Sequence, residues 1–151
     1  MKKVLIFFII LVLFLLGLSF LLPKSSLKTI KVKDKNVKVS LANTNELRTK
    51  GLGGVKSLPQ DQGMLFNFDQ KNIIPSFWMK DMLIGLDMIW IRDGKIIQID
   101  KNIPAPNPTT LDSSLPLYTP KEVIDHVLEV NANWSDKNNV KVGDSVDLGN
   151  L

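Results

Sequence analysis

Two charged residues in the middle of the chain are spaced so that they could act together. Six residues separate Lys80 from Asp87, and they lie at the ends of two expected strands, 76–80 and 86–91. If these consecutive strands form a hairpin, the two charges face each other across the ladder. We expect Asp87 to point inward, because it shares strand parity with Ile89 and Ile91. The pair would be either a core ion pair that fixes strand register or an acid–base or ligand-binding pair at a barrel mouth.

A second group of polar residues lies on the expected strand 126–131. Glu129 and Asn131 share one face of this strand with Val127. They could bring a carboxyl group and an amide to the same barrel mouth, or they could hydrogen-bond to the proline-rich segment. Arg48, on a short expected helix, could join either network, or it could make only a surface or cap contact.

Methionine and aromatic residues are frequent near these polar candidates. As a set they could line a ligand site, or they could simply form the core. The members of this set are Met64, Phe66, Trp78, Met79 and Trp90, with Phe77, Met82 and Met88 beside them.

Other kinds of site are not supported by the residues. The chain has one histidine and no cysteine, so we expect no metal site, and no cofactor is indicated. There is no phosphate-cradling glycine loop and no nucleophile elbow. We therefore assign no catalytic residue from the sequence.

The elements that must position these residues are mostly short strands. Alternation and apolar runs predict strands at 37–41, 63–68, 76–80, 86–91, 95–100, 126–131 and 145–148, and short helices at 44–50 and 134–137. Asp93-Gly94 is typical of a tight hairpin turn, and the proline-rich stretch 103–120 must be a loop. The predicted fold class is mainly β with minor helix (α+β), as a small barrel-like or curled antiparallel sheet with two short helices.

The first 38 residues differ from the rest. Residues 4–22 are almost entirely apolar and would form a helix of about 28 Å, close to the thickness of a bilayer core. We expect 1–23 to be a single-pass membrane anchor with the domain on the external face. The alternative is a signal segment whose cleavage releases a secreted protein. Residues 24–38 are expected to be a lysine-rich linker, followed by a β-rich domain over 39–151.

The charge distribution bears on the possible partners. The chain has a formal net charge of +4, but eight of its lysines lie within residues 1–38, and the remainder is mildly acidic. A nucleic-acid footprint would require basic residues on the folded domain, so we expect no nucleic-acid partner.

Three stretches resemble the domain of unknown function 192 (DUF192) family. The first is Arg48 to Leu52 with Gly63 to Phe68, the second is the block from Phe77 to Ile91, and the third is Val127 to Trp134 with Lys141 to Asp144. The resemblance implies a small β-rich domain, often exported or membrane-anchored, in bacteria and archaea, and it implies no reaction. The chain departs from the family pattern at Gly53, Asp81, Gly85 and Asn133, where the family usually has Met, Asn, Pro and Gly.

These observations favour a non-enzymatic module that binds a small ligand or a protein partner outside the cell. One alternative is a hydrolase-type enzyme that uses Asp87 or Glu129 as a general base. The other is an accessory subunit of another membrane protein, docked through an exposed apolar face.

Overall fold

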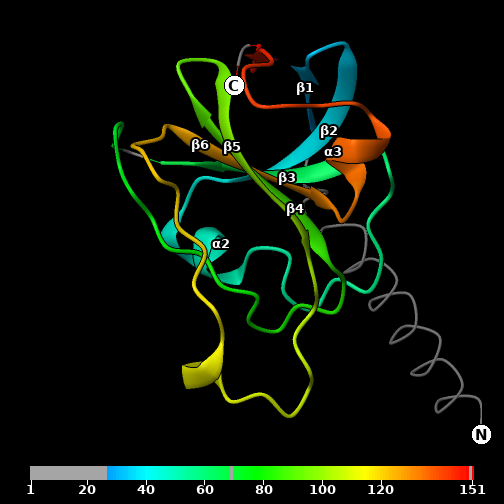
Figure 1. Cartoon of the computed structure of the whole chain (residues 1–151), viewed down its shortest axis with the longest axis vertical. Helices are drawn as coiled ribbons and strands as arrows, with labels where there is room; N and C mark the ends of the chain where they lie inside the picture. Colours follow the sequence, from blue (N-terminus) through cyan, green and yellow to red (C-terminus); the bar gives the residue numbers. More distant parts are fainter. Residues whose placement is uncertain (1–26, 69, 150) are drawn as a thin grey trace, which may run out of the picture.

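The structure is a computed structural model that describes residues 27–68, 70–149 and 151 (Figure 1). Its regular elements are mostly strands, with two short α-helices and one short 3-10 helix. In chain order they are β1 (Lys28–Val32), β2 (Lys35–Ala42), α2 (Asn45–Lys50), β3 (Gln62–Asn67), β4 (Leu86–Arg92), β5 (Lys95–Ile103), η1 (Asp112–Ser114), β6 (His126–Asn131), α3 (Trp134–Lys137) and β7 (Val146–Asp147). The predicted mainly β fold with two short helices is confirmed.

The seven strands form one sheet that curls into a nearly closed barrel. The strand order is β5-β4-β6-β3-β2-β1-β7. The two outer strands, β5 and β7, approach each other at one end, where backbone hydrogen bonds join the chain around them. Ile96 N donates to Asp144 O at 3.0 Å, and Val146 N donates to Gly94 O at 2.8 Å. All neighbours pair antiparallel except β2 and β3, which are parallel. The sheet is therefore mostly antiparallel, and the parallel pair arises because the chain crosses over through α2 between the two strands.

The lysine-rich segment expected to be a linker is largely part of the sheet. β1 and β2 form a hairpin in which Lys28 pairs with Val39 and Val32 pairs with Lys35, and β1 also pairs with β7. Ile30 and Val32 are buried while the residues between them are exposed, so the alternation of a half-buried strand is present among the lysines. Residues 28–32 and 35–38, which are part of the expected linker, are therefore strand residues of the sheet.

The predicted membrane segment, residues 4–22, lies outside the described residues. Within the part of the chain that the structure describes, no helix has the length and apolar character needed to cross a bilayer.

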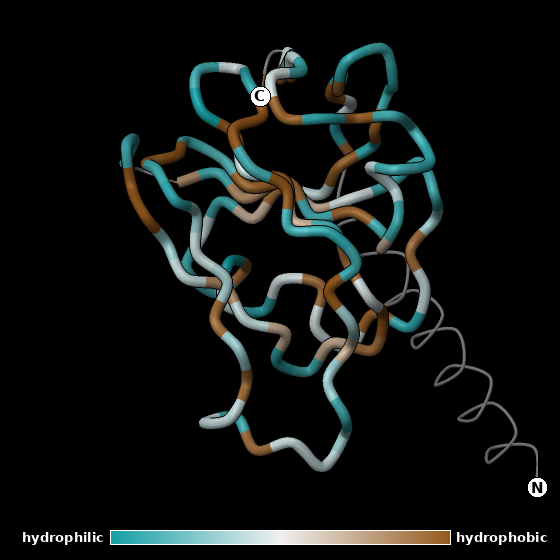
Figure 2. Tube along the Cα trace, in the orientation of Figure 1, coloured by the Kyte–Doolittle hydropathy of each residue, from teal (hydrophilic) through white to brown (hydrophobic). Residues whose placement is uncertain are grey.

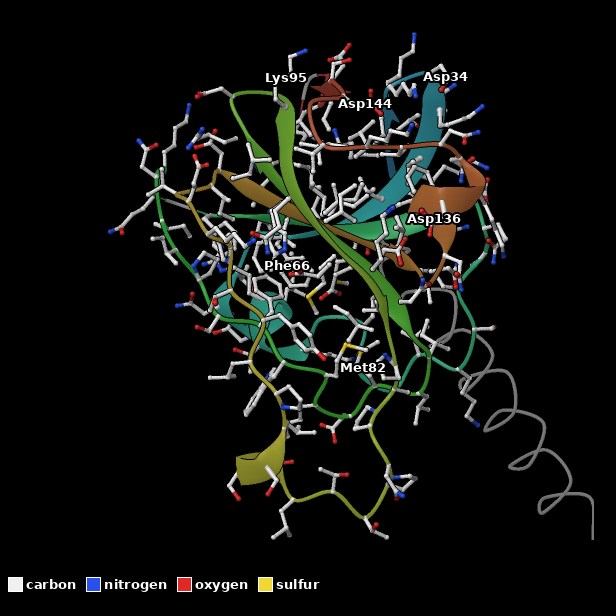
Figure 3. The ribbon with its side chains drawn as sticks, viewed as in Figure 1. Asp34, Phe66, Met82, Lys95, Asp136 and Asp144 are labelled. Carbon is white, nitrogen blue, oxygen red and sulfur yellow. The ribbon has the colours of Figure 1, made fainter. Side chains whose placement is uncertain are left out.

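In the middle strands, both faces of the sheet carry apolar residues. We call the apolar residues inside the barrel the inner core; they come from all seven strands and α3, and include Ile30, Val39, Leu65, Ile89, Ile96, Leu128, Val130, Trp134 and Val146. The outer core lies on the other face of β3, β4 and β6 and includes Met64, Phe66, Met79, Met82, Met88, Trp90, Ile124 and Val127. Hydrophobic stretches accordingly concentrate in the crossing strands (Figure 2), and Figure 3 shows Phe66 and Met82 on the side nearer the long loops.

The outer core is covered by α2 and by two long connections, residues 68–85 and 104–125 (Figure 1). The predicted strand 76–80 is absent. Phe77 and Tyr118 exchange two backbone hydrogen bonds of 2.9 and 2.8 Å, and the chain then turns at Asp81, whose φ is 58°. The proline-rich stretch 103–120 is a loop after its first residue, as predicted, and contributes η1.

Several other local predictions are confirmed. β6 and α3 have the predicted bounds. The Asp93-Gly94 turn has φ values of 50° and 67°, as a tight hairpin between β4 and β5 requires. The predicted helix 44–50 is α2, and Thr44 caps it, because its side chain accepts a hydrogen bond of 3.3 Å from the backbone N–H of Leu47.

Candidate functional site

The expected pairing of Lys80 with Asp87 does not form. Lys80 Nζ donates to Asp112 Oδ2 in η1 and lies 5.4 Å from the centroid of the Trp78 ring. Asp87 is completely buried on the inner face of β4. The prediction failed because residues 76–80 form no strand, so no hairpin brings the two charges together.

Asp87 instead joins two backbone segments. Its carboxylate oxygens accept hydrogen bonds from the backbone N–H groups of Asn102, Asn133 and Ser135 at 2.9, 3.0 and 2.8 Å. These donors lie near the end of β5 and at the start of α3. Because both of its carboxylate oxygens already accept backbone hydrogen bonds, these contacts favour a structural role for Asp87 over that of a general base.

Glu129 faces the outer core from the middle of β6. Its register partners are Met64 on β3 and Met88 on β4, so both neighbours across the ladder are apolar. Asn131 lies further along the same face, and its amide donates to the carbonyls of Leu58 and Pro59 at 2.9 and 3.2 Å. The predicted contact of Asn131 with the proline-rich loop is therefore replaced by one with the loop before β3.

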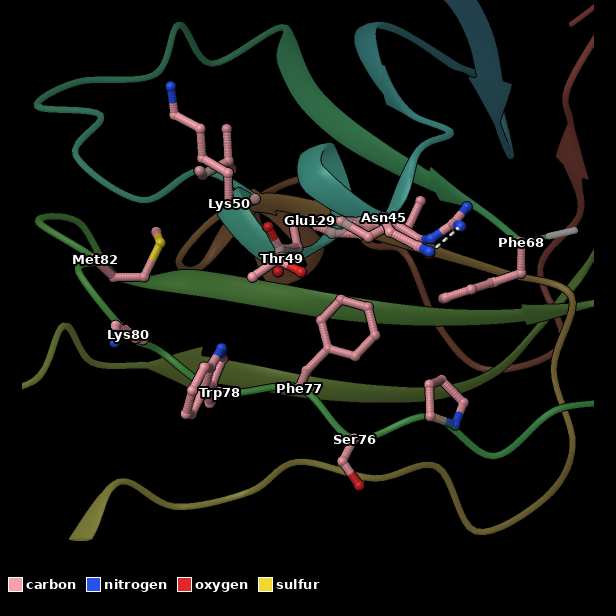
Figure 4. Close-up of a pocket in the computed structure, with 15 residues that line it drawn as sticks. Asn45, Thr49, Lys50, Phe68, Ser76, Phe77, Trp78, Lys80, Met82 and Glu129 are labelled. Carbon is pink, nitrogen blue, oxygen red and sulfur yellow. Dashed lines mark hydrogen bonds between the residues drawn. The ribbon is translucent and has the colours of Figure 1, made fainter. Parts of the chain in front are cut away.

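A cleft with a volume of about 430 Å³ lies beside Glu129, between α2 and the segment 75–82 (Figure 4). β3 and β6 form its floor. The lining residues are Asn45, Arg48, Thr49, Lys50, Gly51, Leu52, Phe66, Phe68, Pro75, Ser76, Phe77, Trp78, Lys80, Met82 and Glu129.

The Glu129 carboxyl group is the most unusual feature of this cleft. The residue is 4% exposed, and Oε2 has no hydrogen-bond partner among the described residues. A Cβ placed on Gly51 would lie only 3.9 Å from this oxygen, so the end of α2 passes close to it. Burial raises the pKa of Glu129 from 4.5 to about 8, because the charged form would lose its hydration. At neutral pH the side chain is therefore a neutral acid that can donate a hydrogen bond.

Arg48 holds one edge of the cleft. Its guanidinium group donates to the Asn67 carbonyl at 2.7 Å and to the Asn45 side chain at 2.8 Å, and it lies 5.8 Å from the centroid of the Phe68 ring. These contacts connect α2 to the end of β3. Arg48 thus shares the cleft with Glu129, although neither predicted network with Asp87 or Asn131 includes it.

The apolar candidates divide between the cleft and the core. Phe66 and Trp78 line the cleft, whereas Met64, Met79 and Trp90 are packed in the outer core. Trp90 also donates from Nε1 to Asp100 Oδ2 at 2.8 Å.

Phe77 connects the cleft to the outer core. Its ring lies edge-on to those of Phe66, Trp90 and Phe68, at centroid distances of 4.8, 5.5 and 6.5 Å. Such arrangements are favourable beyond the area they bury, so the aromatic wall is well supported.

Several lining residues were not among the sequence-predicted site residues. Asn45, Thr49 and Phe68 belong to this group. A signal for two of them was present, because residues 45, 48 and 49 fall on one face of a helix. No comparable signal placed Phe68 beside Arg48, since that contact depends on how α2 packs against β3.

Metal binding finds no support in the described ranges. Residues 27–68, 70–149 and 151 contain no group of three or more His, Cys, Asp or Glu side chains arranged to hold an ion.

The domain is similar to proteins of unassigned chemistry. A family model for DUF192, described as "Uncharacterized ACR", matches residues 28–148. A crystal structure from Sinorhizobium meliloti 1021, titled as a suggested transcription regulator, is 26% identical with a TM-score of 0.69, covering 81% of this chain and 95% of that chain. A protein of unknown function from Novosphingobium aromaticivorans DSM 12444 is 25% identical with a TM-score of 0.72, covering 83% and 89%. No curated protein matches the chain.

Replacing Asp87 by alanine should lower the free energy of unfolding by roughly 3 kcal/mol or more, because three buried N–H donors lose their acceptor. Urea unfolding followed by tryptophan fluorescence measures this loss. Asp112→Ala, which removes the exposed partner of Lys80, is the control and should change stability little. Equal effects of the two substitutions would contradict the structural role of Asp87.

Glu129 should make stability depend on pH. Its pKa is raised in the folded state, so its contribution to stability is fully present below about pH 4.5 and is lost as the pH rises to about 8. The Glu129→Gln variant cannot ionise at this position. Its free energy of unfolding, relative to that of the parent, should therefore increase by up to roughly 4 kcal/mol between about pH 5 and pH 9. Urea unfolding at both pH values measures the gain. A constant difference between the two proteins would mean that Glu129 is not desolvated.

Proposed function

The chain belongs to the DUF192 family, and we propose that it is a non-enzymatic small-molecule-binding module held at the external face of a membrane. The observation that carries the binding function is the carboxyl group of Glu129, which belongs to the lining of an aromatic cleft and whose buried Oε2 has no partner in the described structure. Buried polar atoms are nearly always hydrogen-bonded, and leaving one unpaired costs about 1–3 kcal/mol. A bound molecule that supplied the missing partner would recover that free energy.

The composition of the cleft also supports binding. Most small-molecule sites are concave, largely apolar and contain a few polar groups that fix orientation. Here Phe66, Phe77 and Trp78 supply apolar surface, and Glu129 supplies a polar group at the floor. The volume of about 430 Å³ suits a small ligand.

A hydrolase-type enzyme is the second candidate function. It is favoured by the pKa of Glu129, which at about 8 lies in the range useful for general acid–base catalysis. Two observations oppose an enzymatic function. The Asp87 carboxylate accepts hydrogen bonds from backbone donors, and among the described residues no hydroxyl group hydrogen-bonds to Glu129. Thr49 and Ser76 line the same cleft, but no hydrogen bond joins either hydroxyl to Glu129 in the described structure.

An accessory role for another membrane protein is the third candidate. Large apolar side chains are exposed on the connections that cover the outer core, with Leu111 at 72%, Leu117 at 64%, Ile74 at 59% and Leu83 at 55%. A partner protein could cover them. Isolated exposed side chains of this kind are common on protein surfaces, so we rank this role below ligand binding.

The membrane location rests on residues 4–22. If they span a bilayer, only residues 23–27 connect the span to β1. Five extended residues reach at most about 18 Å. The folded domain would then lie close to the lipid surface, with Lys24 and Lys28 near the headgroups.

A thermal-shift screen of the full chain against metabolites and glycans tests the binding function. A compound that binds the cleft should raise the melting temperature. Glu129→Leu, which removes the polar group of the floor, should reduce that shift, whereas Glu122→Gln, on the exposed Arg92 pair, should not. If no compound raises the melting temperature, the binding function loses its support.

Carbonate extraction tests the membrane location. The full chain should remain in the membrane pellet and begin at Met1, whereas a chain without residues 4–22 should be released. Release of the full chain would show that residues 4–22 do not anchor it, and a mature N-terminus near Phe20 would show that the segment is a removed signal.

A further inference from the structure

Two ligand chemistries could satisfy the buried carboxyl group of Glu129. A neutral acid can donate a hydrogen bond to an acceptor atom, and an ionised one can pair with a cation. We propose that the cleft binds a small uncharged molecule with a ring-containing apolar body, whose oxygen atom accepts a hydrogen bond from Glu129. This inference rests on the proposed binding function and names the class of ligand.

The floor of the cleft favours a neutral contact. Met64 and Met88 flank Glu129 on the adjacent strands, and neither carries a charge or a strong hydrogen-bonding group. Gly51 at the end of α2 brings backbone and no side chain close to Oε2. None of these described neighbours supplies a cation to stabilise an ionised carboxylate, and burial alone raises the pKa of Glu129.

The rim of the cleft disfavours a cationic ligand. Besides Glu129, its charged lining residues are Arg48 and Lys50 from α2 and Lys80 from the covering segment. All three are basic, and an ammonium group would have to pass them to reach the floor. It would also have to ionise Glu129, whose raised pKa opposes that step at neutral pH.

An anionic group would gain too little binding free energy at the floor to offset the loss of its hydration. Moving a carboxylate out of water costs several kcal/mol, and the floor offers one neutral donor in return. Two of the three basic side chains at the rim have partners within the protein: Lys80 is paired with Asp112, and Arg48 donates to Asn67 and Asn45. A ketone, ether or hydroxyl oxygen loses much less hydration on entering.

The walls suit a flat apolar body. Phe77 lies below Glu129 in the view of Figure 4, with Trp78 and Phe68 on either side of it, and all three line the cleft. A more open hollow of about 830 Å³ adjoins the cleft and shares Asn45, Thr49, Lys50, Trp78 and Lys80 with it. A ligand longer than one ring could extend into this hollow.

Four probes of similar size separate the possibilities: acetophenone, ethylbenzene, phenethylamine and phenylacetate. Each is titrated into the full chain in one detergent, and the shifts of the Trp78 indole N–H and the Glu129 backbone amide are followed by NMR. Acetophenone should bind about five- to tenfold more tightly than ethylbenzene, because it alone accepts a hydrogen bond without carrying a charge. Its affinity should fall as the pH rises through about 8, where Glu129 loses its proton.

Two variants assign the effect to Glu129. Glu129→Gln keeps a donor, so acetophenone should still bind and the pH dependence should disappear. Glu129→Leu removes the donor, so acetophenone should bind no more tightly than ethylbenzene.

Tightest binding of phenethylamine, with affinity rising above about pH 8, would overturn the proposal in favour of a cationic ligand, and tightest binding of phenylacetate would overturn it in favour of an anionic one. If none of the probes binds while a compound of the metabolite screen does, the ligand class is wrong but the binding function stands. If neither the probes nor the screen gives binding, both fail.

Discussion

The three central strands must bury two apolar faces. β3, β4 and β6 carry Leu65, Ile89 and Leu128 on one side and apolar residues such as Phe66 and Trp90 on the other. A sheet that is apolar on both faces cannot leave either in water. Closure into a barrel buries the first face, and the second needs a separate cover. The rest of the architecture follows from this requirement.

The layer that covers the outer core consists mostly of loops, and this explains why a cleft is present. α2 is six residues long, too short to cover three strands, so two long connections complete the layer. The 75–82 segment is held to the proline-rich loop by the hydrogen bonds of Phe77 with Tyr118 and by the Lys80–Asp112 pair. Loops pack less regularly than helices, and the space between α2 and this segment remains open to a ligand.

The two buried acids show how differently one chemical group can be used. Asp87 lies inside the barrel and accepts three backbone hydrogen bonds, so its burial is compensated within the protein. Glu129 lies on the outer face with an oxygen that has no partner in the described structure. The first arrangement stabilises the fold, and the second is typical of a functional site, because the missing partner can come from a bound molecule.

The sequence by itself determined the local elements and the fold class. Alternation and turn residues placed β6, α3 and the Asp93-Gly94 hairpin, because these depend on nearest neighbours along the chain. The motifs around Phe77 to Ile91 indicated the family. Frequent lysines concealed β1, since its buried Ile30 and Val32 are recognisable only once a partner strand is known.

Only the tertiary structure decided which residues meet. Lys80 and Asp87 are close in sequence, yet they lie apart because residues 76–80 join the covering layer and not the sheet. Glu129, Arg48 and Phe68 are brought together by the packing of α2 against β3 and β6. Whether a buried carboxyl group finds hydrogen-bond donors depends on backbone positions distant in sequence, and no local pattern encodes those positions.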